Sequence, residues 1–271
     1  MKPRPPVFTH TPLVILTAVL LAALTLGYSA ATWSDSMRAD LKLAFGSLDV
    51  YFPGRGYVAV QGTPETTKDV TVSLVQGTSE GYDNPLYETV SVTIDKLYPR
   101  AWLTVTTPIV NGGTLSARLT GIPVVLVSIT ASDLSTETLP VSYTVWLGNT
   151  PFLTVDLGVI PIDKVYEMYG AGNTFRVGDC IVNVISVNGR LSLQVTAYNA
   201  EPGAVINVGF DPQTGLECSV EENYIPTPPM VPAGSQEDLT IAVSVGDSTT
   251  PSMGEGTSVR LTFSMLFGPP G

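Results

Sequence analysis

The pattern of apolar and polar positions predicts β-strands along most of the chain. The clearest unit is 181–198, where two alternating runs flank Asn188-Gly189, a dipeptide that supplies the two positive-φ positions of a type I′ hairpin turn. Helix signals are weak, and only 163–169 reads as one or two helical turns. Period-two alternation typical of strands also occurs at 70–75, 89–94, 102–106, 141–147, 239–245 and 259–266. We therefore predict an all-β fold.

The N-terminus has the organisation of a secretory signal peptide. A basic start precedes the apolar run Leu13–Leu26, and small residues follow that run. The run is shorter than the roughly 20 residues that span a membrane, although a retained anchor is the alternative. We assign residues 1–30 to the signal peptide, while a cut after Ala31 fits the small-residue rule better than a cut after Ala30. The protein is therefore expected to be secreted, to contact a membrane only during export, and to work outside the cell or at its surface.

The segment after the signal peptide, residues 31–45, reads as one long amphipathic strand. Its alternation is broken only at Asp35 and Ala44. The apolar face carries Trp33, Met37, Ala39, Leu41, Leu43 and Phe45. An unpaired strand at a chain end exposes both backbone groups and apolar side chains. It must therefore pair either with its own sheet or with another molecule.

Charge and composition narrow the function classes. The chain has 13 basic and 24 acidic residues and a net charge of -11, which argues against binding nucleic acid or anionic lipid. The only histidine is His10, inside the predicted signal peptide. The mature form would therefore lack Ser-His-Asp catalysis and histidine zinc sites, and we expect neither enzymatic activity nor a cofactor.

Two further observations concern metals and cysteines. Asp83, Asn84 and Asp247 could offer oxygen ligands to Ca²⁺, but no EF-hand spacing occurs, so a metal site stays undefined. Cys180 and Cys218 are the two cysteines. Because the space outside the cell is oxidising, we favour a disulfide between them. The alternative is two buried free thiols.

Several short elements, in order and spacing, resemble the TasA/camelysin group of secreted fibre proteins. This group includes bacterial biofilm matrix fibres and archaeal bundling-pilus and cannula-type filament subunits. The elements are Gly27–Ser36, Gly46–Val50, Leu97–Pro99, Asn111–Thr114, Val231–Ser235 and Gly256–Ser264. The likeness covers roughly 25–125 and 229–267. One departure is Arg100, which stands where the family has glycine.

The resemblance implies a jelly-roll-like β-sandwich with an N-terminal donor strand. Residues 46–271 would form the sandwich, with an insertion at about 126–228. The apolar residues of 31–45 would fill a groove in the next, identical subunit. Such a head-to-tail contact does not close on itself and so builds a filament. The implied role is support of cell–cell contact or of a biofilm matrix.

A second hypothesis is a monomeric, secreted surface or carbohydrate-binding β-sandwich. In that case Trp33–Phe45 would pair within its own chain, and residues 126–228 would carry the binding site.

Overall fold

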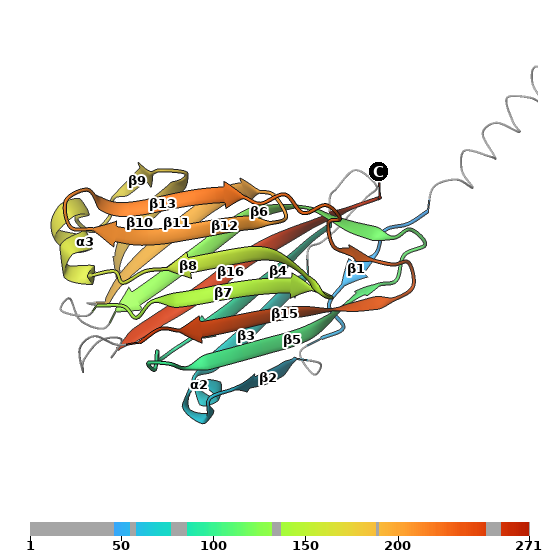
Figure 1. Cartoon of the computed structure of the whole chain (residues 1–271), viewed down its shortest axis with the longest axis horizontal. Helices are drawn as coiled ribbons and strands as arrows, with labels where there is room; N and C mark the ends of the chain where they lie inside the picture. Colours follow the sequence, from blue (N-terminus) through green and yellow to red (C-terminus); the bar gives the residue numbers. More distant parts are fainter. Residues whose placement is uncertain are drawn as a thin grey trace, which may run out of the picture. The chain divides into compact units, whose positions relative to one another are not determined.

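Two β-sheets lie face to face in the part of the chain that folds as one unit from Ser47 onward (Figure 1). The structure, a computed structural model, describes residues 46–54, 58–76, 86–131, 137–187, 190–247 and 256–270. Each sheet has eight described strands. The all-β prediction is confirmed.

The first sheet, called sheet A, runs in the order β1-β5-β15-β7-β8-β12-β13, and β2 also pairs with β5. Its strands are β1 Val50–Tyr51, β2 Ala59–Gly62, β5 Trp102–Asn111, β7 Val141–Leu147, β8 Thr150–Leu157, β12 Ala204–Asp211, β13 Gly215–Glu222 and β15 Gln236–Val245.

The second sheet, called sheet B, runs in the order β3-β4-β16-β6-β11-β10-β9, and β14 also pairs with β6. Its strands are β3 Val70–Gln76, β4 Leu86–Ile94, β6 Ala117–Ala131, β9 Thr174–Val177, β10 Cys180–Val187, β11 Arg190–Ala200, β14 Met230–Val231 and β16 Thr257–Gly268.

Helices are short and few among the described residues. The helix α2 spans Pro64–Lys68, and α3 spans Ile162–Tyr169, close to the predicted turns at 163–169. Neither described helix has the length and apolar character needed to cross a membrane.

The strand order is that of a jelly roll. Successive strands cross between the sheets so that β4, β16, β6 and β11 are neighbours in sheet B, while β5, β15, β7 and β8 are neighbours in sheet A. Every pair within these two sets is antiparallel. Two packed four-stranded sheets joined in this way are the jelly-roll architecture, as the resemblance implied.

The segment 126–228, predicted to be an insertion, contributes strands to both sheets. This segment supplies β7, β8 and β11, which are integral strands of the eight-strand jelly roll. What is added to that pattern is the pair β9–β10, which widens sheet B, and the pair β12–β13, which widens sheet A through a parallel contact with β8. The segment lacked a counterpart in the resembled family, yet its strands bury their alternate side chains in the common core.

The core lies between the sheets and follows from strand alternation. In β5 and β7 every second residue is buried, because successive side chains point to opposite faces. Phe152 of sheet A meets Phe263 of sheet B edge-on, with ring centroids 6.2 Å apart. This contact ties the two layers at the centre of the core.

An inner strand contains a proline. Pro123 lies within β6, between β16 and β11, and proline cannot donate a hydrogen bond to a neighbouring strand. The register of β16 against β6 shifts between Phe263 and Leu266. On the other side, Asn199 has a φ of 55° and interrupts the pairing of β11. The pairing of β6 is therefore irregular on both sides beside Pro123.

A disulfide joins Cys180 of β10 to Cys218 of β13, with the Cα atoms 5.9 Å apart. This is the pairing that the sequence favoured over free thiols. The bond connects sheet B to sheet A near the edges where the added strand pairs lie. It therefore closes the sandwich on that side.

We expect loss of the disulfide to lower stability without changing the fold. The two cysteines are 38 residues apart, and a loop of that length predicts a cost of about 3–4 kcal/mol in the free energy of unfolding. Urea unfolding of a Cys180→Ala/Cys218→Ala variant, compared with the oxidised protein, measures this difference. An unchanged unfolding midpoint would contradict the assignment.

Candidate functional site

Three of the elements singled out in the sequence meet at one corner of the sandwich. They are residues 46–50, 111–114 and 231–235, and we call this corner, together with Leu115, the anchor. Val50 pairs with Asn111 through the strands β1 and β5. Val231 pairs with Ala117 through β14 and β6. Segments far apart in the sequence thus share one hydrogen-bonded site.

Asn111 is the centre of the anchor and is fully buried. Its side-chain amide donates to the carbonyl oxygens of Leu115, at 2.8 Å, and Val231, at 3.0 Å. Its side-chain oxygen accepts the backbone N–H of Gly113 at 3.0 Å, and its own backbone N–H donates to the carbonyl of Ser235 at 2.9 Å. Buried polar groups need such partners, so one residue holds the three segments in place.

Backbone contacts fasten residues 47–49 to the same turn. Gly112 N–H donates to the carbonyl of Asp49 at 2.8 Å, and Thr114 N–H donates to that of Ser47 at 2.9 Å. A Cβ atom at Gly113 would overlap the Ser47 carbonyl oxygen and lie 2.8 Å from the Asp49 nitrogen. Glycine is therefore required here for close approach of the two backbones.

A buried carboxyl group lies beside the anchor. Glu88 of β4 is 1% exposed, and its Oε2 has no hydrogen-bond partner among the residues that the structure describes. Burial, with a smaller contribution from the charge of Asp49, raises the pKa of Glu88 to about 8. A carboxyl group in this setting stays protonated at neutral pH.

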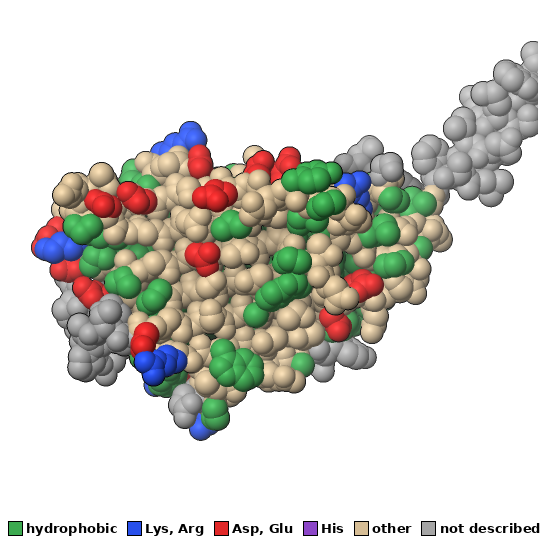
Figure 2. Space-filling view, viewed as in Figure 1, with side chains coloured by type: hydrophobic (Ala, Val, Ile, Leu, Met, Phe, Trp, Pro, Cys, Tyr) green, Lys and Arg blue, Asp and Glu red, His purple; other side chains and the backbone are tan. Residues whose placement is uncertain are grey.

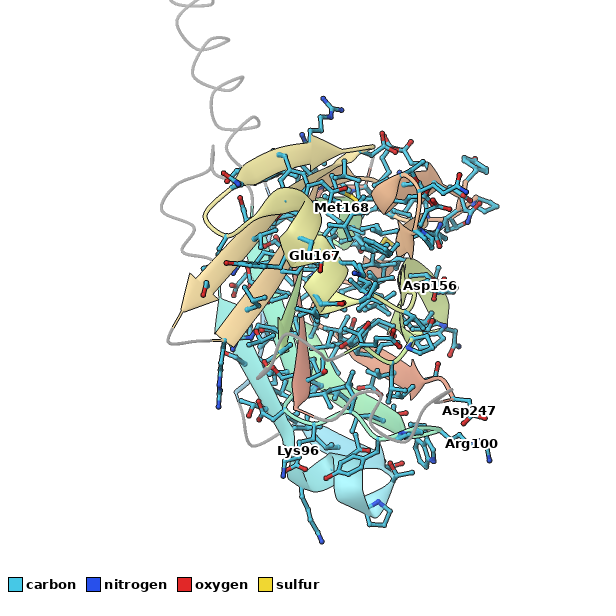
Figure 3. The ribbon with its side chains drawn as sticks, turned by 90° about the vertical axis from the view of Figure 1, so that its left-hand side faces the viewer. Lys96, Arg100, Asp156, Glu167, Met168 and Asp247 are labelled. Atoms are coloured by element: carbon cyan, nitrogen blue, oxygen red, sulfur yellow. A yellow bond between two sulfur atoms is a disulfide. The ribbon has the colours of Figure 1, made fainter. Side chains whose placement is uncertain are left out.

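The turn at 98–101 explains the departure at Arg100. Ala101 N–H donates to the carbonyl of Tyr98, so Pro99 and Arg100 are the central residues of the turn. Arg100 has a φ of 58°. A turn position with a positive φ is usually occupied by glycine or asparagine. The side chain of Arg100 forms an exposed ion pair with Asp247 (Figure 3).

Other predicted site residues stand as follows. The donor-strand residues Trp33, Met37, Ala39, Leu41, Leu43 and Phe45 lie outside the described residues, as do Asp83 and Asn84. Asp247 forms an ion pair with Arg100. Within the described ranges, no three acidic, histidine or cysteine side chains come together as metal ligands.

Comparisons with known proteins give no family for the chain. No family of known proteins matches it, and no curated protein matches it in sequence. Similar solved structures include a carbohydrate-binding module of the β-sandwich superfamily, with 10% identity over 79% of this chain and a TM-score of 0.21; the chain spans 58% of that structure. Another is the enzymatically active domain of tailspike protein 4 of bacteriophage CBA120, with 13% identity over 77% of this chain, 19% of that one, and a TM-score of 0.18.

We predict that Gly113→Ala destabilises the anchor. The added Cβ would push residues 47–49 away from the 111–115 turn, at a cost of about 1–3 kcal/mol typical of overpacking. Thermal unfolding measures the change. The matched control is Gly209→Ala, because a Cβ at Gly209 meets no atom within 4 Å. Equal stability of the two variants would contradict this account.

We predict that Glu88 makes the protein less stable as pH rises from about 4.5 to about 8. The unfolded chain releases this proton near pH 4.5, whereas the folded protein keeps it until about pH 8. Between these values the folded state binds more protons, so stability falls by at most about 1.4 kcal/mol per pH unit. Urea unfolding across this range measures the slope. Glu88→Gln should flatten it, while Glu222→Gln, at an exposed position, should not.

Proposed function

We propose that this protein is a structural subunit of an extracellular filament, joined head-to-tail through residues 31–45 of one copy and the sandwich of the next. The main support for this proposal is the anchor. It fixes residues 47–50 to the sandwich through Asn111 and Gly113. The predicted strand therefore directly precedes a segment that hydrogen bonds hold to the sandwich, which lowers the ordering cost when that strand binds a partner.

The edge of sheet B supports the proposal as the receiving surface. The outer strand β3 has no further neighbour among the described strands. Its inward side chains Val70, Val72 and Leu74 are only partly buried, whereas Val90 and Val92 on the adjacent β4 are fully buried. A strand added beside β3 would pair with its free backbone groups and cover these apolar side chains.

The chemistry of residues 33–45 fits such an edge. Alternate residues Leu41, Leu43 and Phe45 would face the core, continuing the apolar layer of β3. The opposite face of that segment is polar and charged, as suits the outer side of a sheet. Supporting cell–cell contact or a biofilm matrix is the biological role that such a filament would serve.

Two variants test this proposal by separating the two halves of the contact. Leu41→Asp/Leu43→Asp should remove the donor, and Val72→Lys should block the receiving edge. We expect the mature chain to form filaments in negative-stain micrographs and each variant to remain monomeric on size exclusion. Mixed together, the variants should form 1:1 dimers and no filaments, because one intact donor meets one intact edge.

Val60→Lys is the matched control, since Val60 lies on the strand β2 of the other sheet and is 37% exposed. It should leave filaments unchanged. Thermal unfolding of all three variants checks that each still folds. Filaments from a chain that lacks residues 31–45, or discrete monomers of the intact mature chain, would overturn the proposal.

A further inference from the structure

The outer face of sheet A carries one continuous row of polar side chains next to a tryptophan. The row follows the register of six neighbouring strands, each residue being paired with the next. Its members are Trp102, Ser244, Ser142, Asp156, Asn207 and Ser219. Strands lie about 4.8 Å apart, so five steps span roughly 24 Å.

A shallow trough runs beside this row. Two hollows of about 340 and 310 Å³ share Asp156 and Gly158. Their linings also contain Gly209 and Gly246, and the lack of side chains at these glycines lowers the surface. At Gly209 even a Cβ would meet no atom within 4 Å. The glycines therefore form the floor of the trough, and the polar row forms one side.

One pair of side chains in the row is held by a hydrogen bond. The hydroxyl of Ser142 donates to Oδ1 of Asp156, which holds the carboxylate at the junction of the two hollows. Asp156 lies on the same side of the molecule as Arg100 and Asp247 (Figure 3). At one end of the row, Trp102 is 50% exposed, a large aromatic surface left uncovered by the described residues.

Charge decides which kind of ligand fits. The residues lining the two hollows include Asp156 and Glu217 but no lysine or arginine, and the nearby Arg100 is paired with Asp247. Much of the face seen in Figure 2 is neither acidic nor basic. An acidic ligand would be repelled. An apolar protein segment would leave the hydroxyl, amide and carboxylate groups of the row without partners.

We propose that this trough binds an extended, neutral polysaccharide. Hydroxyl groups recurring along a glycan would meet the recurring Ser, Asn and Asp side chains, and the indole of Trp102 would cover the apolar face of a sugar ring. The open, elongated shape suits a segment of a polymer more than an enclosed small molecule. This inference does not depend on filament formation, because all of its residues belong to one sandwich.

Affinity electrophoresis of the mature protein tests the inference with hydroxyethylcellulose, glucomannan and dextran as neutral probes and polygalacturonate as the acidic comparator. We expect retardation by at least one neutral probe and none by the acidic one. Trp102→Ala should weaken binding about tenfold, the loss of one aromatic contact of roughly 1.4 kcal/mol. Gly209→Leu should also weaken it, because the new side chain would stand in the trough, where its Cβ meets no atom within 4 Å.

Tyr198→Ala is the matched control, since Tyr198 is an exposed aromatic residue on β11 of sheet B, 54% exposed. It should bind as the unchanged protein does. Thermal unfolding confirms that each variant folds. The inference fails if no neutral probe retards the protein, if polygalacturonate binds more tightly, or if Trp102→Ala and Gly209→Leu bind normally. It also fails if these two variants change only self-association, since the face would then contact a second copy.

Discussion

The buried residue Asn111 holds together three segments that lie far apart in the sequence, near residues 47–50, 111–115 and 231–235. Its amide reaches the carbonyls of Leu115 and Val231, and its oxygen accepts from Gly113. Because the bonds to Val231 and Gly113 are buried, losing either one would leave an unsatisfied polar atom rather than exchange it for solvent. The short strand β1 has only two residues, so its position depends on this network more than on its own ladder. The location from which residues 31–45 would extend is thereby set by one asparagine.

Much of the fold could be predicted from the sequence because many strands alternate cleanly. The runs at 141–147 and 239–245 became β7 and the larger part of β15, and the hairpin at 181–198 became β10 and β11. The strand β6 could not be predicted in the same way, because Gly121 and Pro123 interrupt its pattern. Only the structure shows that β6 is an inner strand and that its pairing with β16 and with β11 is irregular beside that proline.

The candidate sites differ in how far the sequence could reveal them. The anchor elements were each recognisable as short motifs, but nothing in the sequence placed Val231 beside Asn111. The polar row was not predictable at all, since it arises from the register of six strands and its members are ordinary serines, an asparagine and an aspartate. The strands that residues 126–228 add to both sheets could not be placed from the sequence for a related reason: strand order, rather than local pattern, decides which segments are neighbours in the jelly roll. If both proposals hold, a filament would present many copies of one weak glycan site, and such repetition raises overall avidity.

The last strand of the chain, β16, lies between β4 and β6 in the interior of sheet B. Its hydroxyl contacts with β4 join residues up to 175 positions apart. Sheet B therefore lacks an inner strand until β16 is available, and contacts between such distant residues form slowly. A chain still emerging from a ribosome or an export channel could not complete this layer. The order of the strands thus delays completion of sheet B until β16 has been delivered.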